Sequence, residues 1–121
     1  GVHLTAPVPL AFRGDDGMAR RARAMAWAAE TAPATIDGIA VTEVEDLSLG
    51  ARLPPTPGVV WHLEDRSRVV VRPSGTEPKL KAYVEVVEEV RASTVGAATA
   101  RAGARLARVQ ADLHARFAPF A

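Results

Sequence analysis

The chain has 121 residues, a length that suits one compact domain with a single hydrophobic core. Fifteen Lys and Arg residues against 14 Asp and Glu residues leave a net charge of +1, so no overall field would attract nucleic acid or a membrane surface. Cysteine is absent, which excludes disulfides and thiolate metal sites and favours a reducing compartment, with the cytoplasm as the default.

The N-terminal segment, residues 1–13, is interpreted as an interdomain lead-in followed by a first strand. Pro7 and Pro9 disfavour a helix there, and the alternating apolar residues behind them predict an edge strand. This segment lacks the basic and apolar regions of a signal peptide, and no run of roughly 18 apolar residues predicts a membrane span. The chain begins with Gly1 instead of Met, which suggests a piece of a longer protein.

A helix is expected next, before Pro33. Asp15 or Asp16 can cap it, because a short carboxylate accepts hydrogen bonds from the free N–H groups of a first helical turn. Apolar residues that recur every three or four positions predict the face that packs on the core: Met18, Ala22, Met25 and Ala29. The three arginines of this helix, at positions 20, 21 and 23, lie off that face.

Four strands are expected after this helix. The Asp37-Gly38 turn signal precedes a strand that runs to about residue 44, and residues 46–58 form a long loop stiffened by three prolines. Residues 59–63 and 69–71 flank a polar turn and predict a β-hairpin, with Trp61 among the apolar residues that face the core. Strict alternation from residue 79 to residue 86 predicts a half-buried strand.

A long helix is expected at the C-terminus, capped by Ser93 or Thr94. Its apolar face is predicted to comprise Val95, Ala98, Ala102, Leu106, Val109, Leu113 and Phe117. A neighbouring stripe carries Arg101, Arg105, Arg108 and Arg116. The order of elements is therefore strand, helix, four strands, helix, which indicates an α+β fold with an antiparallel sheet covered on one face by helices.

The segment between the last two predicted strands contains the groups that a phosphate site needs, namely a planar cation, hydroxyl donors and accessible backbone N–H groups. Arg72 offers a bidentate fork, Ser74 and Thr76 offer hydroxyls, and Gly75 lets the backbone approach a ligand. Beyond the loop, Lys81 shares a strand face with residue 79 and can add attraction. By composition alone, Ser-Gly-Thr between strands is more often an ordinary turn, so both interpretations stay open at this point.

The eight residues Arg-Pro-Ser-Gly-Thr-Glu-Pro-Lys at positions 72–79 resemble the phosphate-binding loop of the α-D-phosphohexomutase superfamily, which includes phosphomannomutases and phosphoglucomutases. The resemblance implies that residues 14–121 form the C-terminal domain of such an enzyme, with a TATA-binding-protein-like α+β fold. GVHLT at the start resembles the segment by which the preceding domain joins it. The resemblance further implies which residues grip the phosphate that is not reacting: Arg72, Ser74, Gly75 and Thr76, with Lys81 where some members carry a second basic residue.

By the same resemblance, the parent enzyme interconverts hexose 1-phosphate and hexose 6-phosphate through a bisphosphorylated sugar. Its other domains supply a phosphoserine, a magnesium ion held by an aspartate-rich loop, and a loop that recognises the sugar. None of these three motifs occurs in this chain. We therefore expect no catalytic residue and no metal ligand here, no activity of the chain alone, and two partners, a phosphorylated hexose and the other domains of the parent chain. The choice between mannose, glucose, glucosamine and pentose phosphates depends on the missing sugar loop.

A different class of function also remains open, namely a free-standing module that binds a phosphorylated protein or nucleic acid through the same loop. The arginine stripe of the last helix invites a nucleic-acid interpretation, against which stand the net charge of +1 and the absence of a recognised binding motif. The three histidines, at positions 3, 62 and 114, show no metal-ligand spacing. The acidic residues Glu43, Glu45 and Asp46 are interpreted as a solvated strand end.

Overall fold

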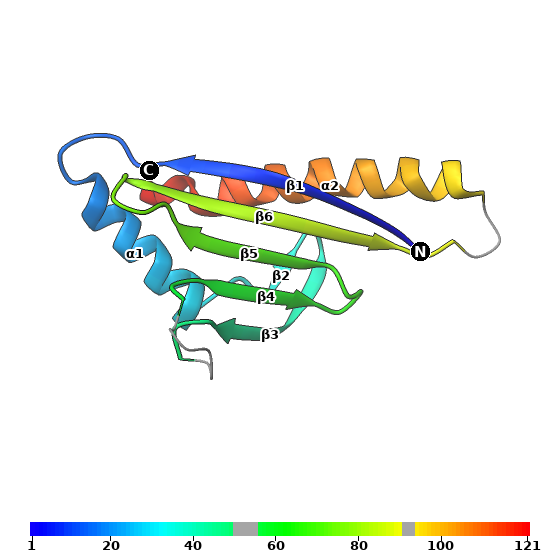
Figure 1. Cartoon of the computed structure of the whole chain (residues 1–121), viewed down its shortest axis with the longest axis horizontal. Helices are drawn as coiled ribbons and strands as arrows, with labels where there is room; N and C mark the ends of the chain where they lie inside the picture. Colours follow the sequence, from blue (N-terminus) through cyan, green and yellow to red (C-terminus); the bar gives the residue numbers. More distant parts are fainter. Residues whose placement is uncertain (50–55, 91–93) are drawn as a thin grey trace.

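The computed structural model describes residues 1–49, 56–90 and 94–121. In chain order the elements are β1 (Val2–Ala11), α1 (Gly17–Glu30), β2 (Thr35–Ile36), β3 (Ile39–Asp46), β4 (Val59–Leu63), β5 (Arg68–Pro73), β6 (Lys79–Glu88), α2 (Val95–Phe117) and a short 3-10 helix, η1 (Ala118–Phe120) (Figure 1). Within these described ranges, no helix is both long and apolar enough to cross a membrane.

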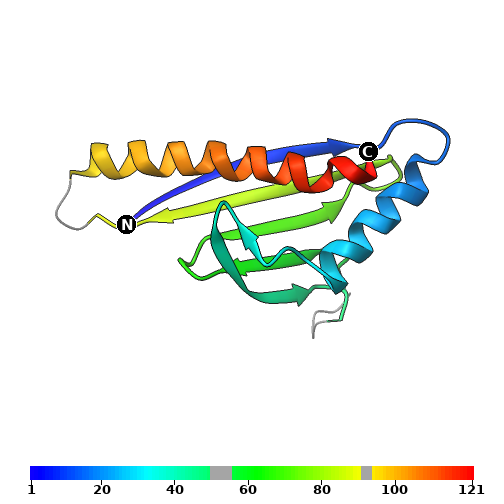
Figure 2. The ribbon, with the colours of Figure 1, turned by 180° about the vertical axis from the view of Figure 1, so that it is seen from behind.

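The strands form one antiparallel sheet in the order β1-β6-β5-β4-β3-β2. Both helices lie over the same face of this sheet, and no helix in the described residues covers the other face (Figure 2). The predicted α+β fold, with an antiparallel sheet, helices on one side and a TATA-binding-protein-like arrangement, is therefore confirmed. The helices cover one face of β6, which explains the alternation of buried and exposed residues along this strand.

The strands after α1 number five in the described residues, where four were expected. The additional strand, β2, arises because Thr35 and Ile36 pair with Ala40 and Ile39, so that the Asp37-Gly38 turn closes a small hairpin. At the start of the chain, the expected lead-in is itself part of β1, which pairs with β6 over ten residues. Of the loop expected at 46–58, residues 50–55 lie outside the described residues.

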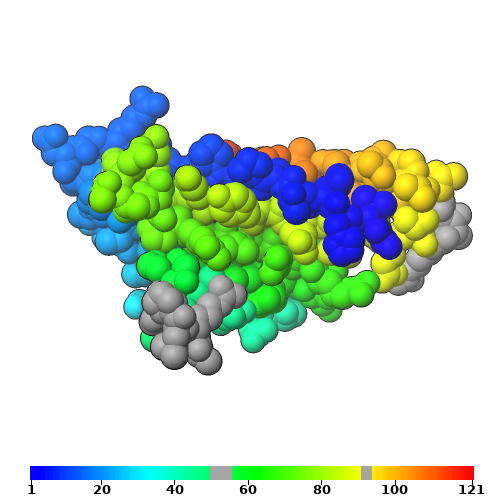
Figure 3. All heavy atoms as spheres, viewed as in Figure 1, coloured from blue at the N-terminus to red at the C-terminus, as the bar shows by residue number. Residues whose placement is uncertain are grey.

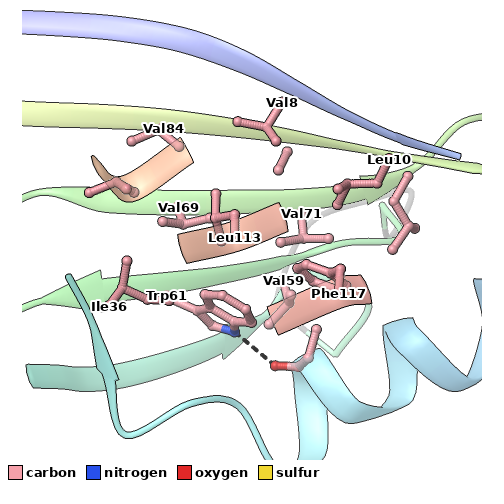
Figure 4. Packing of buried hydrophobic residues seen from close by; sticks show 14 of the residues in the cluster. Val8, Leu10, Ile36, Val59, Trp61, Val69, Val71, Val84, Leu113 and Phe117 are labelled. Atoms are coloured by element: carbon pink, nitrogen blue, oxygen red, sulfur yellow. Dashed lines mark hydrogen bonds between the residues drawn. The ribbon is translucent and has the colours of Figure 1, made fainter. Parts of the chain in front are cut away.

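The buried face of α1 differs in part from the prediction. Met25 and Ala29 pack against the core while partly exposed, as expected. Met18 is 44% exposed and Ala22 is also exposed, whereas Ala24 and Ala28 are fully buried. The reason is close packing: the small alanines bring the helix backbone near Trp61, whose indole N–H donates to the Ala28 carbonyl at 2.8 Å (Figure 4). The tryptophan is fully buried, as expected, because its one polar atom finds this partner inside the core.

The apolar face of α2 follows the prediction closely. Ala98, Ala102, Val109, Leu113 and Phe117 are buried, and Leu106 packs against the core while partly exposed. Val95 is 63% exposed because it is the first residue of the helix, beyond the region that the sheet covers. The Thr94 side chain caps the helix by accepting from the Ala97 N–H at 3.0 Å, while Ser93 lies outside the described residues.

Asp16 occupies the N-cap position of α1, but its side chain makes no capping hydrogen bond. It instead accepts from Nε of Arg20 at 3.0 Å, one turn into the helix. This hydrogen bond, together with the positive charge of Arg20, lowers the pKa of the Asp16 carboxyl below its ordinary value. The acidic start of the helix is therefore stabilised by an ion pair rather than by a cap.

Candidate phosphate site

Two basic residues of neighbouring strands lie opposite each other at one end of the sheet. Arg72 is close to the end of β5, and its register partner on β6 is Lys81. Residues paired in this way share a face, and the buried neighbours Val71 and Leu80 point to the helix side. Arg72 and Lys81 therefore lie on the face that the helices leave uncovered.

The loop that joins these two strands begins at Ser74 and is tightly closed. The Glu77 N–H donates to the Ser74 carbonyl at 3.0 Å, and the Ser74 N–H donates to the Lys79 carbonyl at 3.0 Å. Gly75 follows the first turn residue with φ +39°, a backbone conformation that favours glycine. Gly75 thus supplies the positive φ that the turn contains. Gly75 and Thr76 are exposed at the tip of the turn.

Several hydrogen-bond donors of this region have no partner among the described residues. Among residues 1–49, 56–90 and 94–121, neither the guanidinium of Arg72 nor the ammonium of Lys81 makes a hydrogen bond or ion pair. Within the same ranges, the hydroxyls of Ser74 and Thr76 and the N–H groups of Gly75 and Thr76 also lack a partner. Like charges directly opposite each other in a sheet are destabilising. An anion bound between Arg72 and Lys81 would offset that repulsion and satisfy the free donors.

The arginines of α2 form a clear contrast. Each pairs with a carboxylate of the same domain, and the pairs are Arg101–Glu88, Arg105–Asp65, Arg105–Glu88, Arg108–Asp37 and Arg116–Asp112. These pairs join α2 to the sheet, to the β2–β3 turn and to itself. The stripe that the sequence analysis singled out therefore has a structural use, and its charge is compensated within the domain.

The loop is supported from behind by α1 and the segment before it. The Phe12 N–H donates to the Pro78 carbonyl at 2.8 Å, and Nη1 of Arg21 donates to three loop carbonyls, those of Ser74, Gly75 and Glu77. In Figure 3 the atoms of the β5–β6 connection lie at one end of the uncovered face, next to the segment that leads into α1. The contacts of Arg21 could not be predicted from the sequence, because nothing in the sequence indicates a partner more than 50 residues away.

The histidines and the acidic residues near the end of β3 were the other candidate site residues, and their contacts are typical of a protein surface. His62 pairs with Glu45 at 3.1 Å on the uncovered face, and His3 and His114 are exposed. Glu43 is exposed, and Oδ1 of Asp46 accepts from the N–H and hydroxyl of Ser48. In the part of the chain that the structure describes, no three His, Asp or Glu side chains are grouped so as to hold a metal ion. The acidic strand end therefore fits the solvated interpretation.

The fold and the loop together define a class of protein. It is an α+β domain that has, at one end of an open sheet, cations and hydrogen-bond donors without a partner among the described residues. A family model described as "Phosphoglucomutase/phosphomannomutase, C-terminal domain" matches residues 19–102. This match covers more than half of the chain and includes Arg21, the β5–β6 loop and Lys81. The chain therefore belongs to the family of C-terminal domains of phosphoglucomutases and phosphomannomutases. A search of curated protein sequences found no match.

Proposed function

We propose that this domain grips the non-reacting phosphate of a phosphorylated hexose inside a phosphohexomutase, the enzyme that interconverts hexose 1-phosphate and hexose 6-phosphate. The observation that carries this proposal is the pair Arg72 and Lys81, which face each other across β5 and β6 without a counterion among the described residues. Family membership supports the enzyme class. It also favours the mutase over a free-standing module for phosphorylated proteins or nucleic acids.

Each group in the site has a distinct part in the proposed grip. Arg72 donates two parallel N–H bonds to phosphate oxygens, and Lys81 supplies a second positive charge from the neighbouring strand. Ser74 and Thr76 donate through their hydroxyls, and the N–H groups of Gly75 and Thr76 complete the set. All these groups recognise phosphate rather than sugar. Such a grip suits a reaction in which the bisphosphorylated intermediate must turn over and present its other end.

The site is open to solvent, with Gly75, Thr76 and Lys81 exposed. A sugar phosphate bound there would have its sugar beyond this domain, so other surfaces must enclose it. We therefore propose that the domain works with the other domains of a parent chain, which supply the phosphoserine and the sugar-recognition loop. Magnesium belongs to the same proposal as a cofactor held by another domain, because the described acidic residues here do not form a metal site. The cytoplasmic location stays a prediction.

The test is a titration of the ¹⁵N-labelled chain with glucose 6-phosphate and mannose 6-phosphate, with unphosphorylated glucose as the control. We expect amide shift changes centred on Gly75 and Thr76 with either sugar phosphate and none with glucose. Arg72→Met, which keeps the length of the side chain and removes its donors, should abolish most of the response. Shift changes centred on α2, or equal responses to glucose, would contradict the proposal.

A further inference from the structure

Arg21, a half-buried residue of α1, lies against the inner side of the β5–β6 loop. Its Nη1 donates to the carbonyl of Glu77 at 2.7 Å, to that of Gly75 at 3.0 Å and to that of Ser74 at 3.4 Å. One guanidinium nitrogen carries two hydrogens, so the longest of these contacts is a shared and weaker one. Three carbonyls of one short loop are thus turned toward a single cation.

This arrangement determines where the loop N–H groups point. In a trans peptide the C=O and the following N–H point in opposite directions. Because Arg21 holds the carbonyls of Ser74 and Gly75, the N–H groups of Gly75 and Thr76 are directed to the other side of the loop. These are the two N–H groups that donate to no residue in the described ranges. Adjacent N–H groups directed the same way form an anion-binding concavity.

We propose that Arg21 is a positioning residue, which shapes the loop for phosphate without touching the ligand. The inference rests on the proposed function, since it concerns how the same loop binds. Without the Arg21 contacts, the loop would sample other conformations, and phosphate binding would then have to order it. A preorganised loop avoids that cost. Arg21 thus couples the docking of α1 on the sheet to the conformation of the site.

The experiment compares the wild-type chain with Arg21→Met, which keeps the apolar stem of the side chain and removes its donors. Arg23→Met is the matched control, because Arg23 is an exposed arginine of the same helix with no hydrogen bond to the loop. In the absence of ligand, the backbone order parameters of residues 74–77 should fall in Arg21→Met from about 0.85 to below about 0.6. Its affinity for glucose 6-phosphate should fall roughly tenfold. Arg23→Met should match the wild type in both measurements.

The possible outcomes test the positioning role of Arg21 separately from the phosphate site itself. If the wild-type chain binds glucose 6-phosphate at the loop and Arg21→Met binds it equally well, the positioning role is wrong and the phosphate site stands. A loss of affinity with an unchanged loop order would show that Arg21 acts only through its charge, which also overturns the inference. If the wild-type chain itself does not bind at the loop, the proposed function fails, and the inference fails with it. Should Arg21→Met not fold, the same measurements on Arg21→Leu, which also lacks donors, decide, and wild-type order and affinity in that variant would overturn the inference.

Discussion

Arg72→Lys tests the proposed site most directly, because it keeps the positive charge and removes the planar fork. A lysine ammonium is a point charge that cannot make the two parallel hydrogen bonds of a guanidinium to a phosphate. The loss of one charge-assisted hydrogen bond costs about 1–3 kcal/mol, so the affinity for glucose 6-phosphate should fall between several-fold and about a hundredfold. The stability of the free chain should barely change, because the Arg72 guanidinium makes no hydrogen bond or ion pair within the described residues.

The assay combines the amide-shift titration with a thermal melt of the same sample. Arg68→Lys is the matched control, since Arg68 lies on the same strand and the same face, is exposed, and is 3.8 Å from the carboxylate of Glu85. This control should leave the affinity unchanged and the free energy of unfolding within about 0.5 kcal/mol of the wild type. If Arg72→Lys binds glucose 6-phosphate as tightly as the wild type and only its stability falls, Arg72 is a turn residue, and the reasoning is refuted.

Three further outcomes are expected. Gly58→Ala should weaken phosphate binding and cost about 1–3 kcal/mol of stability, because Gly58 has φ +151° and an added Cβ would lie 3.1 Å from Cγ of Arg72. Gly38→Ala is the control, since its φ is positive but nothing lies within 4 Å of an added Cβ, and it should lose stability alone. Equal phosphate affinities in the two variants would contradict this account. The affinity for glucose 6-phosphate should increase between about pH 5 and pH 7, because the phosphate monoester loses its second proton near a pKa of about 6. An equal increase in the affinity for sulfate would show that the effect comes from the protein instead. The chain alone should show no mutase turnover with glucose 1-phosphate or mannose 1-phosphate, even with magnesium and a bisphosphate activator, because it lacks the serine motif. Turnover by a rigorously purified sample would argue against the proposed dependence on other domains.

Local sequence was enough to predict most of the architecture. The alternation along β6 and the three-to-four spacing along α2 report directly which side chains face the core, because a strand or long helix packed on one side must repeat its apolar residues with its own period. The same logic was only partly right for α1. Met25 and Ala29 pack against the core as predicted, but the fully buried residues are Ala24 and Ala28. An alanine-rich helix offers several faces of similar polarity, and spacing cannot choose between them.

The members of the candidate site could likewise be named from sequence, because Arg72, Ser74, Gly75 and Thr76 lie within five consecutive residues. Only the tertiary structure decided how they are arranged. It placed Lys81 opposite Arg72, left both without a counterion among the described residues, and brought Arg21 from a distant helix to the loop carbonyls. Contacts between residues more than 50 positions apart depend on strand register and helix docking, which are properties of the packed core as a whole. The sequence by itself therefore determined which chemical groups are present. Packing determined which of them lack a partner among the described residues and in which direction they point.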